Sequence, residues 1–218
     1  VLGEGLTPEN VILRWTLNRD LQVIMPDGAI VTVQNQDGSY YSDLVGIEKI
    51  SFADGTVWDR SDIARLAITG TDGDDKIISS YRDETLEGGK GNDHFHSLGG
   101  YNTYKFGPGD GQDIIEKTSG RIQFKEGIGQ NDVEFTRDER DVIATLKSTG
   151  DSIRLVDWLY GWPRVSSFEF ANGTVLNERH ISEAVEAGDE SEVIFGSPDA
   201  DVLIGTEKNT TIYAGDGD

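Results

Sequence analysis

The sequence predicts an all-β protein in which parallel β-rolls alternate with small, mainly antiparallel β modules. Two observations carry this prediction: a glycine- and aspartate-rich repeat of nine residues occurs in two runs, and a longer β-rich stretch occurs twice. Repeats of fixed period are units that bury their apolar faces by stacking on neighbouring copies. The repeats therefore predict the architecture before any single element is considered.

The repeats divide the chain into four segments. We expect a β-rich module at 1–69, a β-roll at 70–118, a second β-rich module at 119–185 and the start of a second roll, cut in mid-repeat, at 186–218. We expect neighbouring modules of the same chain to bind one another. Because the chain opens with Val1 rather than Met, we expect it to be an excised piece of a larger protein.

The two β-rich modules share three ordered matches. Residues 4–11 match 126–133, residues 28–33 match 151–156, and residues 50–57 match 168–175. Runs such as Val11–Leu17 and Val142–Leu146 mix apolar and β-branched residues as half-buried strands do, and Asp54-Gly55 and Asn172-Gly173 are turn signals. A short helix is expected to close each module, after Ser61 and after Asn177.

The nine-residue repeat begins at Gly70–Ile78 and is a full match at Gly88–His96. Six glycine- and aspartate-rich residues would make a turn, and three would make a strand whose middle side chain points inward. That eighth position is apolar in every nonapeptide of the first run: Ile77, Leu86, Phe95, Tyr104 and, after the insertion of Phe106-Gly107, Ile115. Two nonapeptides complete one coil, so every second turn lies on the same side of the roll.

Stacked turns of this composition predict calcium sites. Aspartate carboxylates and backbone carbonyls would converge between coils, and calcium takes six to eight oxygen ligands. Glycine allows those carbonyls to point inward where a Cβ would clash. The expected metal-binding residues are Gly70, Asp72, Gly73, Asp75, Gly88, Lys90, Gly91, Asp93, Gly109, Asp110, Gly111, Asp113, Gly196, Asp199 and Asp201.

The sixth position of the turn predicts on which side of the first roll the ions lie. Asp75, Asp93 and Asp113 occupy it on one side, whereas Glu84 and Asn102 occupy it on the other. We therefore expect one ion between Asp75 and Asp93 and a second between Asp93 and Asp113. In the second run, Asp201 is expected to face the truncated turn at 214–218.

These nonapeptides resemble the RTX family of haemolysin-type calcium-binding repeat proteins, whose repeat is G-G-x-G-x-D-x-U-x. The two β-rich modules resemble the haemolysin-type calcium-binding protein related module, through Phe52–Trp58 and Phe170–Val175. The resemblance implies a secreted or cell-surface bacterial protein, exported by a type I system. It also implies a structural module that is disordered without calcium and folds on binding it outside the cell.

Composition excludes several other function classes. A net charge of −21 without clustered Lys or Arg argues against nucleic acid and against anionic membranes as partners. No apolar run is long enough to span a bilayer, and the absence of cysteine excludes thiol chemistry. No catalytic motif is present, so we expect no enzymatic activity.

Two further motifs leave alternatives open. His94 and His96 could bind a transition metal, although two outward-facing surface residues are the simpler interpretation. Trp158, Tyr160 and Trp162 could stack on a carbohydrate or protein ligand, or they could pack over the end of the roll. An adhesive module shaped by calcium, or the non-catalytic part of a secreted hydrolase, thus remains the alternative function.

Overall fold

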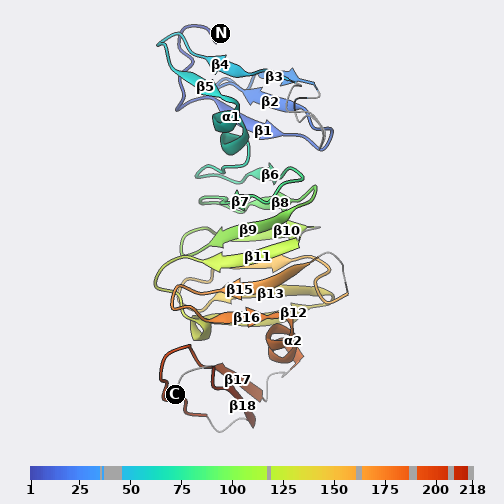
Figure 1. Ribbon diagram of the computed structural model, residues 1–218, viewed down its shortest axis with the longest axis vertical. Helices are drawn as coiled ribbons and strands as arrows, with labels where there is room; N and C mark the ends of the chain where they lie inside the picture. Colours follow the sequence, from blue (N-terminus) through green and yellow to red (C-terminus); the bar gives the residue numbers. More distant parts are fainter. Residues whose placement is uncertain are drawn as a thin grey trace.

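The computed structural model describes residues 1–34, 36, 46–116, 119–160, 164–186, 191–205 and 209–215, with only the backbone for Ser191 and Glu192. The described chain is an elongated column with its two ends at opposite poles, and its strands lie across the long axis (Figure 1). Strands predominate, and only two short α-helices occur in this part. The all-β prediction is confirmed at the level of fold class.

The first β-rich copy forms one pole of the column. Its first three strands make an antiparallel sheet in the order β1-β2-β3, and the next two form a hairpin. The Asp59 carboxylate caps the following helix by accepting the N–H groups of Ser61 and Asp62, because a helix start leaves such groups unpaired. The elements are β1 (Ile12–Trp15), β2 (Leu21–Ile24), β3 (Ile30–Val33), β4 (Lys49–Ser51), β5 (Val57–Asp59) and α1 (Arg60–Leu66).

The nonapeptide run continues as two stacks of parallel strands between which the chain alternates. Strands β6, β8 and β10 pair in one stack, and β7, β9 and β11 pair in the other. The bounds are β6 (Lys76–Ile78), β7 (Thr85–Leu86), β8 (His94–His96), β9 (Tyr101–Phe106), β10 (Gln112–Glu116) and β11 (Ser119–Phe124).

Two columns of apolar side chains fill the space between the stacks. Each member lies beside its neighbour on the next strand and is at most 2% exposed. The columns are Ile77, Phe95, Ile115 and Leu155 in one stack, and Leu86, Tyr104, Ile122 and Phe168 in the other. The five residues expected to point inward at the eighth position are all among them. Burial of such side chains stabilises the fold by about 1.5–3 kcal/mol each.

The second β-rich copy continues both stacks. Strand β14 pairs in parallel with β10, and β15 pairs in parallel with β11. The sheets and the main hydrophobic core therefore run across the expected division between residues 118 and 119. The elements are a 3-10 turn (Gln130–Asp132), β12 (Val133–Asp138), β13 (Asp141–Leu146), β14 (Ser152–Leu155), β15 (Val165–Glu169), β16 (Val175–Asn177) and α2 (Glu178–Glu186).

The second nonapeptide run lies at the other pole. It contains β17 (Ser191–Phe195) and β18 (Asn209–Tyr213), which pair in parallel, with the Phe195 and Tyr213 rings stacked 5.5 Å apart. The expected strand at residues 202–204 is not formed. Val202 is 89% exposed, since the described residues supply no neighbouring coil on which this side could pack.

Candidate metal centre

Three stacked turns form the candidate site. Residues 70–75, 88–93 and 108–113 precede β6, β8 and β10, whose parallel pairing stacks the turns along the long axis. Their last residues, Asp75, Asp93 and Asp113, form a column that we call the aspartate ladder. Asp93 is 1% and Asp113 is 3% exposed. The structure thus brings together the three carboxylates that sequence spacing singles out.

Backbone hydrogen bonds fix the geometry of the aspartate ladder. The Asp75 N–H donates to Asp93 Oδ1 at 2.9 Å, and the Asp93 N–H donates to Asp113 Oδ1 at 2.9 Å. Each carboxylate is therefore oriented by the coil that precedes it. One oxygen of Asp93 is used in this way, which leaves its second oxygen free to face another partner.

That second oxygen, Asp93 Oδ2, is buried and accepts no hydrogen bond from the described residues. Burial, together with the charges of Asp75, Asp74 and Asp110, raises the pKa of Asp93 to about 6. Burial, together with the charges of Asp93 and Asp110, raises the pKa of Asp113 to about 7. A bound cation would relieve both the unpaired oxygen and the mutual repulsion of the carboxylates.

Two glycines show how closely the turns approach. A Cβ on Gly88 would lie 1.9 Å from Asp93 Oδ2. Gly111 has a φ of +94°, and a Cβ there would lie 2.0 Å from the carbonyl oxygen of Gly91. Glycine is therefore required at both positions, because it lets carboxylate and carbonyl oxygens occupy the space between adjacent turns, which we call the gap. Gly70, Gly73, Gly88, Gly91, Gly109 and Gly111 all lie in these turns.

The donor set in the gap suits a hard cation. Among the described residues, no three acidic or histidine side chains converge as a metal-binding cluster. A cation would therefore need backbone carbonyl oxygens beside the carboxylates of Asp93 and Asp113. All these donors are oxygen, which calcium prefers.

Other predicted ligands are already paired. Asp72 and Lys90 lie at the surface, 79% and 67% exposed, with Lys90 Nζ 2.6 Å from Asp72 Oδ2. Asp110 accepts the Gly107 N–H at 2.8 Å on one oxygen and Lys125 Nζ at 2.8 Å on the other. Because of these contacts, Asp93 and Asp113 are the carboxylates that remain as candidate ligands for a cation in the gap.

Sequence reasoning missed a second ladder at the fifth position of the turn. The Asn92 N–H donates to Asp74 Oδ1 at 2.8 Å, and the Gln112 N–H donates to Asn92 Oδ1 at 2.9 Å. This ladder runs in the opposite direction to the aspartate ladder, since each side chain accepts from the following coil. The signal was present, because Asp or Asn recurs nine residues apart at Asp74, Asp83 and Asn92.

The turn at 108–113 is closed by a residue of the second copy. Asp151, which precedes β14, accepts the Gly109 N–H at 2.7 Å and the Gly111 N–H at 3.1 Å. Although its partial burial acts the other way, the hydrogen bonds from Gly109, Thr149 and Gly111 hold the pKa of Asp151 below its ordinary value. Two backbone N–H groups of the last turn on this side therefore donate to a carboxylate from outside the nonapeptide run.

The turns on the opposite side, at 79–84 and 97–102, satisfy their polar groups among themselves. The Glu84 N–H donates to Asn102 Oδ1 at 3.0 Å, as in the aspartate ladder. Serines take the place of glycine at the first position, and Asn102 Nδ2 donates to Ser97 Oγ at 3.0 Å. Ser79 and Ser97 hydroxyls also bond each other at 3.2 Å. A neutral network fills this side where the aspartate side leaves a buried oxygen unpaired.

The turn of the second run resembles the first turn of the first run. The Ser197 N–H donates to Asp201 Oδ2 at 2.6 Å, as the Thr71 N–H donates to Asp75 Oδ2 at 2.5 Å. A Cβ on Gly196 would lie 2.2 Å from the Ala214 carbonyl oxygen, so this turn lies against the start of the next one. Asp199 is exposed, and residues 216–218 lie outside the described part of the chain.

Arg14 of the first copy ends the aspartate ladder. Its guanidinium pairs with Asp75 Oδ1 and donates to the Thr69 carbonyl oxygen at 3.0 Å. The side chains of Arg14 and Asp75 are only 8% and 11% exposed. Asp75 is thus neutralised by a protein cation, while Asp93 and Asp113 are not.

Replacement of Arg14 should reveal this role. Arg14→Met leaves Asp75 buried and unpaired, and is expected to lower the free energy of unfolding by about 3–5 kcal/mol. Urea unfolding of both proteins measures the change. Arg65→Met is the control, because Arg65 is 62% exposed and its pair with Asp62 is expected to contribute at most about 1 kcal/mol. Equal effects of the two substitutions would contradict the role given to Arg14.

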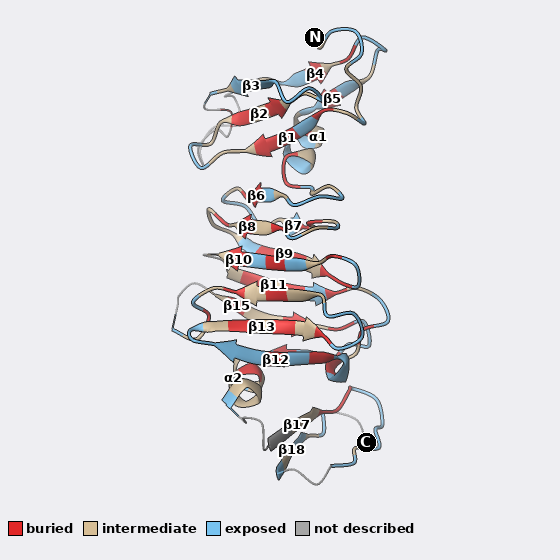
Figure 2. Ribbon diagram, turned by 180° about the vertical axis from the view of Figure 1, so that it is seen from behind, coloured by how far each residue is buried: buried red, intermediate tan, exposed pale blue. Residues whose placement is uncertain are grey.

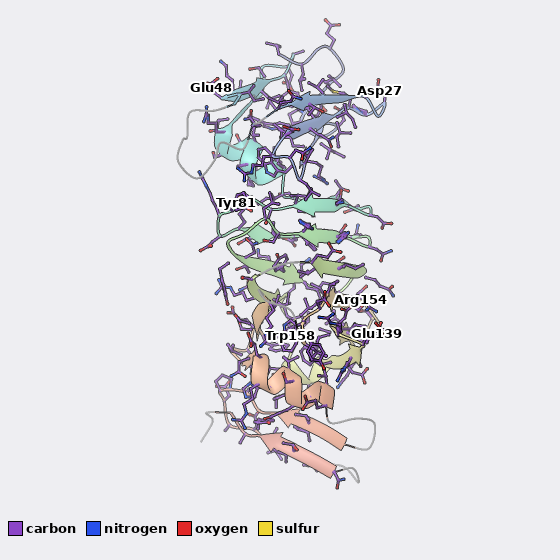
Figure 3. The ribbon with its side chains drawn as sticks, turned by 90° about the vertical axis from the view of Figure 1, so that its right-hand side faces the viewer. Asp27, Glu48, Tyr81, Glu139, Arg154 and Trp158 are labelled. Carbon is purple, nitrogen blue, oxygen red and sulfur yellow. The ribbon has the colours of Figure 1, made fainter. Side chains whose placement is uncertain are left out.

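The two remaining motifs lie apart from the ladder. His94 Nε2 and His96 Nδ1 each lie 3.3 Å from a carboxylate oxygen of Glu116. These contacts lower the pKa of Glu116, although its partial burial acts the other way. Trp158 is labelled in Figure 3. It lies in the second copy, is 3% exposed and donates to the Val165 carbonyl oxygen at 2.8 Å. Tyr160 is 66% exposed. Trp162 lies outside the described residues.

The comparisons with known proteins bear on the two β-rich copies. No curated protein matches the chain. None of the described helices is long and apolar enough to cross a membrane. Residues 28–62 and 141–179 match the family model of the haemolysin-type calcium binding protein related domain. The chain is therefore similar to the haemolysin-type calcium binding protein related domain over one segment of each β-rich copy, and the predicted resemblance to this domain is confirmed.

Proposed function

We propose that this chain is a calcium-binding structural module whose two parallel stacks form an RTX-type β-roll. The observation that carries the proposal is the buried, unpartnered Oδ2 of Asp93 beside Asp113, in a gap lined by glycine and carbonyl oxygens. Calcium, when bound, supplies two positive charges and accepts six to eight oxygen ligands. The second run, with Asp201, is proposed to bind in the same way.

The chain's own residues explain why folding would depend on the ion. Asp93 and Asp113 resist ionisation in the folded chain, so at neutral pH their carboxylates oppose folding. The overall charge of −21 adds repulsion. Only the side with Asp93 and Asp113 is proposed to bind calcium, because the serines and Asn102 satisfy the opposite side.

We further propose that the four segments are modules of a larger secreted or cell-surface bacterial protein, exported by a type I system. Low cytosolic calcium would keep the roll unfolded, and extracellular calcium would fold it. No catalytic role is proposed. The alternative function, an adhesive surface, has less support, because Trp158 is part of the core and is not exposed to a ligand.

A calcium titration of the chelator-treated chain tests the proposal. The far-ultraviolet circular dichroism signal of β structure is expected to rise with calcium, with a midpoint of roughly 10⁻⁴–10⁻³ M, the range of extracellular modules. Magnesium is the control, because its strict octahedral geometry suits water better than carbonyl-rich turns. The same spectrum and the same urea midpoint in chelator and in calcium would contradict the proposal.

A further inference from the structure

The two β-rich copies have the same fold. The series β1-β2-β3, β4-β5, α1 repeats as β12-β13-β14, β15-β16, α2. When the buried residues of β2 and β13 are aligned, strand pairing matches Val31 to Ile153 and Val33 to Leu155. The sequence alignment places this strand one residue away, since it matches Ile30 to Ile153. The two copies can therefore be compared position by position.

The comparison shows an open edge on the first copy. In the second copy, β14 and β15 pair on their far edges with β10 and β11 of the preceding roll, and Ile153 is 1% exposed. In the first copy, β3 is the last strand of its sheet within the described residues and is coloured as exposed in Figure 2. Its residue Val31 is 51% exposed. An apolar position of the core face is thus left uncovered.

A hydrogen bond marks where the missing strand would lie. The Leu2 N–H donates to the Ser51 carbonyl oxygen at 2.8 Å. In the shared alignment, Ser51 corresponds to Glu169, and Leu2 corresponds to Phe124 at the end of β11. Gln123 and Glu169 are partners in the pairing of β11 with β15. Residues 1 and 2 therefore run beside β4 as the end of β11 runs beside β15.

Both copies contact a nonapeptide run on their other side. In the first copy, Arg14 pairs with Asp75 of the run that follows. In the second copy, Gln130 Nε2 and Asn131 Nδ2 donate to the Phe195 carbonyl oxygen at 3.0 and 3.1 Å. Only the second copy also has a roll before it in the described structure.

We propose that the edges of β3 and β4 are a docking surface for the last coil of a nonapeptide roll joined in cis to Val1. Its two strands pair in parallel with β3 and β4, as β10 and β11 pair with β14 and β15. The side chain of Val31 then closes the apolar column of that roll, as Ile153 does. This inference goes beyond calcium binding, and it rests on the proposed function only in that the added roll must be folded. Covering the edge also removes an exposed strand that would otherwise be open to aggregation.

A chain with a duplicated roll tests the proposal. A copy of residues 70–122 is joined directly to Val1, so that Val1 and Leu2 take the places of Gln123 and Phe124. Hydrogen exchange of the β3 and β4 amides is measured in this chain and in the original one, both in calcium. Exchange is expected to be about tenfold slower in the extended chain, while β14 serves as the internal reference.

Two variants make the test specific. Val31→Asp is expected to restore fast exchange at β3 in the extended chain and to change little in the original, where Val31 faces solvent. A duplicate of residues 70–121 shifts the register by one residue, which turns apolar side chains outward, and should give no protection. Unchanged β3 exchange with a protected β14 would overturn the proposal. So would a dimer of the original chain that Val31→Asp dissociates, because the occupant would then be a second copy.

Discussion

Asp93→Asn should change the stability of the chain in opposite directions with and without calcium. In chelator at neutral pH, the variant is expected to be more stable than the original, because it removes a buried carboxylate whose pKa is raised to about 6. The amide oxygen can still accept the Asp75 N–H, as Asn102 accepts the Glu84 N–H. In calcium, loss of a charged ligand should raise the calcium midpoint for folding by about tenfold or more.

Calcium titrations followed by circular dichroism, and urea unfolding in chelator, measure the two effects. Asp83→Asn is the matched control, since Asp83 lies on the opposite side and accepts the Tyr101 N–H at 2.7 Å in an exposed position. Asp93→Ala should also raise the midpoint more than Asp83→Ala. Equal shifts for the two positions would contradict calcium binding along the aspartate ladder.

Without calcium, the stability of the chain should fall as pH rises from 5 to 8. The pKa of Asp93 is raised to about 6 and that of Asp113 to about 7, so the folded chain holds protons that the unfolded chain has already lost. Stability is therefore greatest below these pKa values. Each carboxyl lowers the free energy of unfolding by up to about 1.4 kcal/mol per pH unit as it is forced to ionise.

Calcium should reverse the trend, because it binds the ionised carboxylates and displaces their protons. The calcium midpoint is expected to fall steeply between pH 5 and pH 8. Urea unfolding at several pH values, in chelator and in saturating calcium, measures both slopes. The double variant Asp93→Asn, Asp113→Asn should flatten the chelator profile over this range. A profile that keeps its slope in the double variant would assign the effect to the overall charge instead.

The nonapeptide period was sufficient to predict the apolar columns between the two stacks and the aspartate ladder. Both depend on local spacing: an apolar residue at position eight, an aspartate at position six, and an alternation of coil sides. The inward position of Phe95 and the place of Asp93 in the ladder could be predicted without knowledge of distant segments. The turn at Asp54-Gly55 was predictable for the same reason. The helix cap expected at Ser61 is instead Asp59, two residues earlier, because its carboxylate accepts the first free N–H groups of the helix.

Contacts between distant segments were not predictable from spacing. Arg14 lies 61 residues from Asp75, and Asp151 lies 42 residues from Gly109. Nothing in the repeat marks either residue, because the first belongs to one β-rich copy and the second to the other. Lys125 likewise meets Asp110 only because β11 lies beside the turn. The pairing of β14 with β10 could not be read from a hydrophobic pattern that suits several sheet orders.

The direction of the inter-coil hydrogen bonds has a mechanical consequence. Strands lie across the column and their ladders run along it, so a load applied between the two ends pulls one coil away from the next (Figure 1). Such a load breaks the hydrogen bonds between neighbouring coils one after another, rather than many of them at the same time. Each released coil of eighteen residues supplies about 60 Å of extended chain. A module of this shape would therefore yield stepwise under tension, and ions held between coils would set the force at which it does.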